Sequence, residues 1–128
     1  MEWTDAVGAF EQALQRFREV LAEPETTVVR DAAIKRFEFT FELGWKATQR
    51  FLRAQGIVSR SPKQCLQEAF AFGLVQDNPL WIRMLEDRNL TVHTHDERTA
   101  QKIYNGLRDY LPLFEQLHQG LSRHLGAK

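Results

Sequence analysis

The sequence predicts an all-α protein, an up-down four-helix bundle with one additional short helix. Three observations lead to this fold class. Apolar residues recur at three- and four-residue spacing over long stretches, proline and glycine mark the ends of those stretches, and the connections between them are short. The 128 residues are expected to form a single domain, residues 1–128, which is long enough to bury roughly two-thirds of the surface that its unfolded chain exposes.

The first helix is predicted to begin near Trp3 and to end near Glu23, because Pro24 disfavours helix in the residue before it. Its apolar residues follow a heptad spacing over about three heptads. They are Trp3, Val7, Phe10, Leu14, Phe17 and Leu21.

The second helix is predicted from about Thr27 to Gln55, with Thr26 or Thr27 as its cap and Gly56 as its stop. Its apolar residues form two stripes. One holds Ile34, Phe37, Phe41, Trp45, Thr48 and Leu52, and the other holds Phe39, Leu43 and Ala47. Because the apolar arc is so wide, this helix is expected to be central in the bundle or to contact a second subunit as well.

The third helix is predicted to start at the capping box Ser61-Pro62-Lys63-Gln64, with proline at the first helical position, and to end at Gly73. Its inward side chains are expected to be Cys65, Leu66, Ala69 and Phe70.

The fourth helix is predicted to open at Asn78-Pro79, with Trp81, Met84, Leu85 and Val92 facing the core. Arg88 lies on the same stripe, where an inward arginine is costly unless an anion meets it. A second capping box, Thr94-His95-Asp96-Glu97, predicts a break near His93 and a new helix directly after it.

The last helix keeps three- and four-residue spacing for three heptads. Its core positions are Ala100, Ile103, Leu107, Tyr110, Phe114, Leu117 and Leu121. Pro112 is expected to kink this helix without ending it, because the pattern continues unbroken. Gly120 and Gly126 are expected to loosen its end.

The composition is that of an ordinary globular protein, with 43% hydrophobic and 27% charged residues. Lys and Arg balance Asp and Glu at 17 each, which argues against non-specific coating of nucleic acid but not against a small site for one phosphodiester. The single cysteine fits a reducing compartment. Since neither a signal peptide nor an apolar run of roughly 20 residues is recognisable, we expect a cytoplasmic protein with no membrane association.

Three segments carry a resemblance to a known family: RDAAIKRFEFTFELGWKATQRFL, SPKQCLQEAFAFGLV and DRNLTVHTHDE. Over about residues 3 to 120 the chain resembles the nucleotidyltransferase-substrate-binding family of small four-helix bundles within the HEPN superfamily. The mark of that superfamily is an arginine, usually with a polar neighbour, and a histidine a few positions later. By this resemblance Arg88 and His93 match the catalytic pair, and Asn89 matches the polar neighbour.

The resemblance also implies partners. It implies a homodimer or a higher homo-oligomer, and a separately encoded minimal nucleotidyltransferase. In many members the two proteins form a toxin–antitoxin pair in which the bundle is a metal-independent ribonuclease. Many such toxins carry tyrosine two positions after the histidine, where the transferase attaches AMP. Here His95 stands at that position, so the resemblance does not extend to tyrosine adenylylation there.

The candidate site residues suit RNA cleavage. That reaction removes a proton from the 2′-hydroxyl, stabilises a charged phosphorane and protonates the leaving 5′-oxygen. Imidazole, which titrates near about pH 6.5 when unperturbed, suits the first or the last step, and a guanidinium suits the second. On a straight helix Arg88 and His93 would lie about 140° apart. The break near His93, or a dimer axis, is therefore needed to bring them together.

Both residues of the pair also have a purely structural interpretation. Arg88 could form an internal ion pair with Glu38, Glu42 or Glu86. His93 could donate a hydrogen bond to a carbonyl at the end of its helix.

Further candidates for substrate binding lie on either side of the pair. His95 could be a second acid–base group, a phosphate contact or a solvated neighbour of the cap. Asp96 could orient a histidine or complete the helix start. Lys46, Arg50 and Arg53 share one helix face within a segment, 43–67, that contains no acidic residue. This face could guide RNA, dock an acidic partner or be a solvated surface.

A metal site or a cofactor is not expected. Glu115-x-x-His118 matches only half of a di-iron motif, and His93-x-His95 lacks further ligands. Cys65 is expected to be a core residue. Because no glycine-rich phosphate loop occurs, the chain is not expected to be a nucleotidyltransferase itself.

Three functions remain open from the sequence. The chain could be a ribonuclease toxin, a non-catalytic subunit that binds a nucleotide for a nucleotidyltransferase, or a structural bundle whose polar cluster is a buried network.

Overall fold

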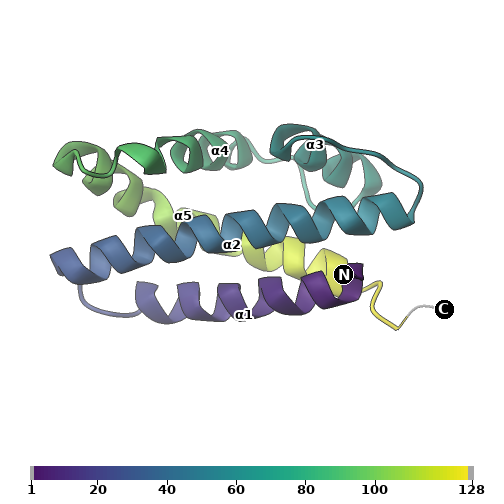
Figure 1. The fold of residues 1–128 in the computed structure, drawn as a ribbon, viewed down its shortest axis with the longest axis horizontal. Helices are drawn as coiled ribbons and strands as arrows, with labels where there is room; N and C mark the ends of the chain where they lie inside the picture. Colours follow the sequence, from purple (N-terminus) through teal and green to yellow (C-terminus); the bar gives the residue numbers. More distant parts are fainter. Residues whose placement is uncertain (1, 127–128) are drawn as a thin grey trace.

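The computed structural model describes residues 2–126 and confirms the all-α fold class (Figure 1). Its segments are α1 (Trp3–Leu21), α2 (Thr27–Ala54), α3 (Pro62–Phe72), α4 (Leu80–Leu90), the 3₁₀ turn η1 (Thr91–His93) and α5 (Glu97–Ser122). No helix within residues 2–126 is long and apolar enough to cross a membrane.

The principal helices run in alternating directions. Figure 1 shows α1 and α2 side by side and antiparallel, with α3 and α4 end to end above α2, and α5 returning behind them. The junction of α4 and α5 lies at the end of the bundle opposite the two termini. Helix α2 contacts α1, α3, α4 and α5, which confirms its predicted central place.

The core is built from the predicted heptad positions of α1 and α5. All seven predicted core residues of α5 are buried, and so are the α1 positions except Trp3, which is half-buried edge-on against Phe51. Aromatic rings join the three long helices, with Phe17 packing edge-on against Phe114 at a centroid distance of 5.8 Å. Edge-on pairs of this kind contribute beyond the area that they bury.

Local capping residues set most helix ends as expected. The Thr26 hydroxyl accepts a hydrogen bond from the amide of Val29 at 3.0 Å, and the Ser61 hydroxyl accepts one from the amide of Gln64 at 3.1 Å. Gly73 ends α3 in the left-handed conformation, with φ of 94°, and Gly56 follows α2 with φ of 85°.

Three predicted core positions are wrong. Phe70 is 50% exposed, Val92 is 74% exposed and Phe39 is 53% exposed. Phe70 and Phe39 lie on the outer edges of broad apolar arcs whose centres are buried. Val92 lies in η1, where the change from α to 3₁₀ geometry turns it away from the stripe of α4.

Two predictions about α5 are also wrong. The N-cap is Asp96 and not Thr94, because the Asp96 carboxylate accepts a hydrogen bond from the amide of Arg98 at 3.0 Å. Gly120 does not loosen the end of the helix, since it is buried against the backbone of Leu74. Pro112 lies inside α5 without ending it, as predicted.

Candidate functional site

The break between α4 and α5 is formed by residues that hydrogen-bond locally. The Thr91 hydroxyl donates to the carbonyl of Arg88 at 2.7 Å, and the Thr94 hydroxyl donates to the carbonyl of Thr91 at 3.2 Å. The Thr91 hydroxyl thus adds a second donor to the carbonyl of Arg88, which already accepts from the amide of Thr91 at the end of α4. The predicted break near His93 is therefore confirmed, and it presents a short polar segment at one end of the bundle.

Arg30 of α2 holds the first turn of α5 in place. Its side chain is only 8% exposed, and its two terminal nitrogens meet the two carboxylate oxygens of Glu97 at 2.8 and 3.1 Å. This hydrogen bonding and the charge of Arg30 lower the pKa of Glu97. The segment between α4 and α5 is thus fixed on the side of α5 by a bidentate ion pair.

Arg88 does not point into the core, contrary to the prediction from its stripe. Its side chain is 33% exposed, and its guanidinium carbon lies 5.4 Å from the ring centroid of Phe41. One terminal nitrogen donates to Glu42 at 3.2 Å and the other donates to the side-chain carbonyl of Asn89 at 3.2 Å. The structural interpretation of Arg88 offered Glu38, Glu42 and Glu86 as ion-pair partners. In the structure the partner is Glu42.

Glu42 is the acceptor that three neighbouring polar side chains share. One of its oxygens accepts from the indole of Trp45 at 3.0 Å and from Arg88, and the other meets the ammonium of Lys46 at 3.0 Å. Partial burial opposes ionisation of Glu42, but the hydrogen bonds from Trp45 and Lys46 and the charge of Arg88 outweigh it and lower the pKa. Glu42 is therefore a carboxylate at neutral pH.

The two histidines of the segment are exposed and close to each other. The ring centroids of His93 and His95 lie 6.3 Å apart. Within residues 2–126 no hydrogen bond or ion pair joins His93 to Arg88, and none joins the His93 imidazole to a helix-end carbonyl. The break thus leaves both imidazoles exposed to solvent, without assembling the predicted pair in one copy of the chain.

The remaining candidates lie on α4, at the start of α5 and on α2. Asn89 is exposed beside Arg88, and Asp96 is exposed as the cap of α5. Lys46, Arg50 and Arg53 lie on α2, with Lys46 already paired to Glu42.

A second polar cluster, between α4 and α5, was not predicted. Asp87 is only 5% exposed, and it accepts a hydrogen bond from the hydroxyl of Tyr110 at 2.5 Å. Arg83 donates to the same hydroxyl at 2.8 Å and to Asp109 at 2.8 Å. Burial and the bond to Asp87 raise the pKa of Tyr110. The burial of Asp87 could have been predicted from its spacing. Asp87 follows the buried Met84 by three residues, and residues three apart lie on the same face of a helix.

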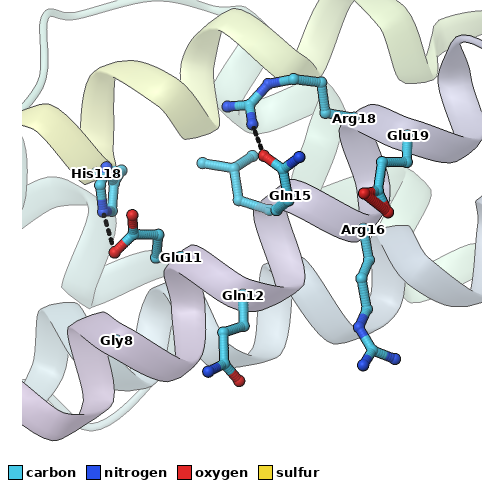
Figure 2. Close-up of a pocket in the computed structure, with 9 residues that line it drawn as sticks. Gly8, Glu11, Gln12, Gln15, Arg16, Arg18, Glu19 and His118 are labelled. Carbon is cyan, nitrogen blue, oxygen red and sulfur yellow. Dashed lines mark hydrogen bonds and ion pairs between the residues drawn. The ribbon is translucent and has the colours of Figure 1, made fainter.

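A pocket between α1 and α5 contains none of the candidate site residues (Figure 2). In it His118 lies 3.7 Å from Glu11, and Arg18 donates to Gln15. Glu115 pairs with Arg18 at 3.2 Å, so the Glu115-x-x-His118 pattern does not converge on one point. No group of three or more potential metal ligands exists among residues 2–126.

Comparison with known proteins points to one family. The family model described as "Nucleotidyltransferase substrate binding protein like" matches residues 2–123. A curated Haemophilus influenzae protein named "Probable ribonuclease HepT" is 34% identical over 108 residues, which covers 74% of this chain and 74% of that protein.

Two solved structures are similar in fold and sequence. A crystal structure of a protein from Thermus thermophilus has a TM-score of 0.81 at 43% identity, covering 88% of this chain and 98% of that one. A Haemophilus influenzae structure, described as revealing the fold of a substrate binding domain of a nucleotidyltransferase, has a TM-score of 0.69 at 28% identity. It covers 94% of this chain and 96% of that one. The chain therefore belongs to the nucleotidyltransferase substrate binding protein-like family, of HEPN type.

Proposed function

We propose that this protein is a metal-independent ribonuclease of HEPN type, that it acts as a homodimer or higher homo-oligomer, and that its partner is a minimal nucleotidyltransferase. The observation that carries the proposal is the exposed polar segment at the helix break. Within a few residues it offers a guanidinium, an amide and two imidazoles to solvent. The relative named as a probable ribonuclease supports the same function.

Each side chain has a role that its chemistry suits. His93 acts as general base or general acid on the 2′-hydroxyl or the leaving 5′-oxygen. Arg88 stabilises the charge of the phosphorane, and Asn89 orients the guanidinium through the hydrogen bond at 3.2 Å. His95 and Asp96 border the path of the substrate, and Lys46, Arg50 and Arg53 extend it along α2.

The test is cleavage of a fluorogenic single-stranded RNA in the presence of EDTA. Cleavage by the purified protein is expected, and His93→Ala and Arg88→Ala are each expected to slow it by about 10² or more. His118→Ala is the matched control, because His118 lies in the pocket between α1 and α5 and is expected to have no role. Wild-type rates in both site variants would refute the proposal.

A second function is favoured by a specific observation, the ion pair between Arg88 and Glu42. An arginine that is already neutralised, and that does not contact His93, suits a subunit that only holds an anionic nucleotide for a nucleotidyltransferase. The similarity to the Haemophilus influenzae structure described as a substrate binding domain of a nucleotidyltransferase supports this function. Nucleotide binding measured by calorimetry, without any RNA cleavage, would favour it over the ribonuclease.

A further inference from the structure

The contacts of Glu42 resemble those of a bound anion. A carboxylate that receives an arginine, a lysine and an indole N–H is held by the same donors that recognise a phosphate. Here the three donors come from two elements, with Trp45 and Lys46 on α2 and Arg88 on α4. The cluster is partly open, since the side chains of Glu42 and Arg88 are 38% and 33% exposed.

Arg88 does not depend on Glu42 alone for its position. Asn89 accepts a hydrogen bond from its other terminal nitrogen, and the ring of Phe41 lies under the guanidinium. If the Glu42 carboxylate moved away, these two contacts would still hold Arg88 at the surface. Two cations, Arg88 and Lys46, would then face an incoming anion.

We propose that Glu42 is an internal counter-ion occupying an oxyanion site formed by Arg88 and Lys46, and that a phosphate group of the substrate binds there by displacing the Glu42 carboxylate. The inference rests on the proposed function in that it takes Arg88 as the group that binds phosphate. Beyond that function, the inference assigns Glu42 as a residue that weakens the binding of phosphate. By this assignment Glu42 makes the site selective, because only a ligand with a well-placed phosphate can replace the carboxylate.

The test uses the full chain and a probe that cannot be cut. A fluorescein-labelled, fully 2′-O-methylated oligonucleotide keeps the phosphodiesters but lacks the attacking hydroxyl, so its Kd can be measured by fluorescence anisotropy. Glu42→Gln keeps an oxygen that accepts from Trp45 and removes the negative charge. Since the repulsion between two charges a few ångströms apart at a protein surface is substantial, we expect the Kd to fall by about three- to tenfold.

The matched control is Glu38→Gln, one helical turn earlier on α2, which removes the same charge without a bond to Arg88. Its Kd is expected to stay within about twofold of the wild type. If Glu42→Gln fails to fold, Glu42→Ala replaces it, and the same fall in Kd is expected because the negative charge is removed in both variants. In an Arg88→Gln background the gain from Glu42→Gln is expected to shrink, because the carboxylate acts through Arg88.

An unchanged or increased Kd in the Glu42 variants would overturn the inference, and so would an equal gain in Glu38→Gln. Failure of the proposed function gives a different result. If Glu42→Gln binds the probe more tightly but neither it nor the wild type cleaves the matching RNA, the counter-ion assignment stands and the ribonuclease proposal fails.

Discussion

Asp87 is a charged residue that the bundle holds in its interior by hydrogen bonding. It lies three residues after Met84 on the buried face of α4, where an unpaired carboxylate would be strongly unfavourable. The hydroxyl of Tyr110 donates to it, and Arg83 donates to that hydroxyl from the solvent side. The tyrosine hydroxyl therefore connects the buried carboxylate to an exposed guanidinium.

The first prediction concerns this hydroxyl. Tyr110→Phe leaves Asp87 without its hydrogen-bond donor, so the free energy of unfolding is expected to fall by about 1–3 kcal/mol. Urea unfolding at neutral pH measures the loss. Tyr104→Phe is the matched control, since its buried hydroxyl has no hydrogen-bond partner among the described residues and its removal is expected to cost nothing. Equal stabilities of the two variants would contradict the role of Tyr110.

The same hydroxyl gives a dependence on pH. The pKa of Tyr110 is raised in the folded protein, so the unfolded chain ionises first, at about pH 10. The stabilisation is therefore full below about pH 10 and decreases as the pH rises further. In urea unfolding above about pH 10, the wild type is therefore expected to lose more stability than Tyr110→Phe, which has no hydroxyl at this position.

The sequence was wrong about the direction of the Arg88 side chain, which is 33% exposed and pairs with Glu42. Arg88 was assigned to the core stripe because Trp81 and Met84 lie seven and four residues before it. The buried position is instead Asp87, one residue earlier. Because the next residue along a helix is rotated by about 100°, an error of one position moves a side chain from the core to the surface.

At the scale of the helices, the ends could be predicted where a cap depends on a few neighbouring residues. Thr26, Ser61 and Gly73 act as expected for this reason. The predicted N-cap of α5 lies two residues before the observed one, because Thr94 and Asp96 are both residue types that cap helices well. The choice between them depends on η1, and a short 3₁₀ turn leaves no clear pattern in the sequence.

The second prediction compares two glycines in helices. A Cβ at Gly120 of α5 would lie well inside van der Waals contact of the carbonyl oxygen of Leu74, which is backbone and cannot turn aside. Gly120→Ala is therefore expected to lower the free energy of unfolding by about 1–3 kcal/mol or more. Gly8→Ala in α1 has open space around its Cβ and is expected to raise it by about 0.5–1 kcal/mol.

Thermal unfolding of the two alanine variants beside the wild type measures both changes. Since alanine is the better helix former at either position, intrinsic propensity alone would give both variants a higher Tm. A higher Tm for Gly120→Ala would show that α5 and the segment before α4 do not pack as closely as described.

At the scale of the whole molecule, the fold could be predicted because its core follows one repeated rule of spacing. The heptad positions of α1 and α5 are local patterns, and the tertiary structure confirms them. The candidate site depends instead on pairs that are distant in sequence. Arg88 meets Glu42 across 46 residues, and Arg30 meets Glu97 across 67. No local pattern specifies which acidic residue an arginine will meet.

The last prediction concerns how the proposed catalytic pair, Arg88 and His93, is assembled. Because Arg88 and His93 form no hydrogen bond or ion pair within one described chain, we expect each active site of the proposed ribonuclease to combine Arg88 of one subunit with His93 of the other. Subunits carrying Arg88→Ala or His93→Ala can be co-expressed with different affinity tags and purified as heterodimers. A twofold axis then leaves one of the two sites intact, so the heterodimer is expected to show about half of the wild-type activity, whereas each variant alone is inactive.

The converse heterodimer is the control. A wild-type subunit paired with an Arg88→Ala/His93→Ala subunit leaves no intact site if the sites are shared, but leaves one intact site if each subunit holds its own pair. Shared sites therefore require activity in the first heterodimer and none in the second, measured on the same RNA. The reverse pattern would place both residues in one subunit, and the break between α4 and α5 would then have to move on substrate binding to bring the imidazole of His93 to the guanidinium of Arg88.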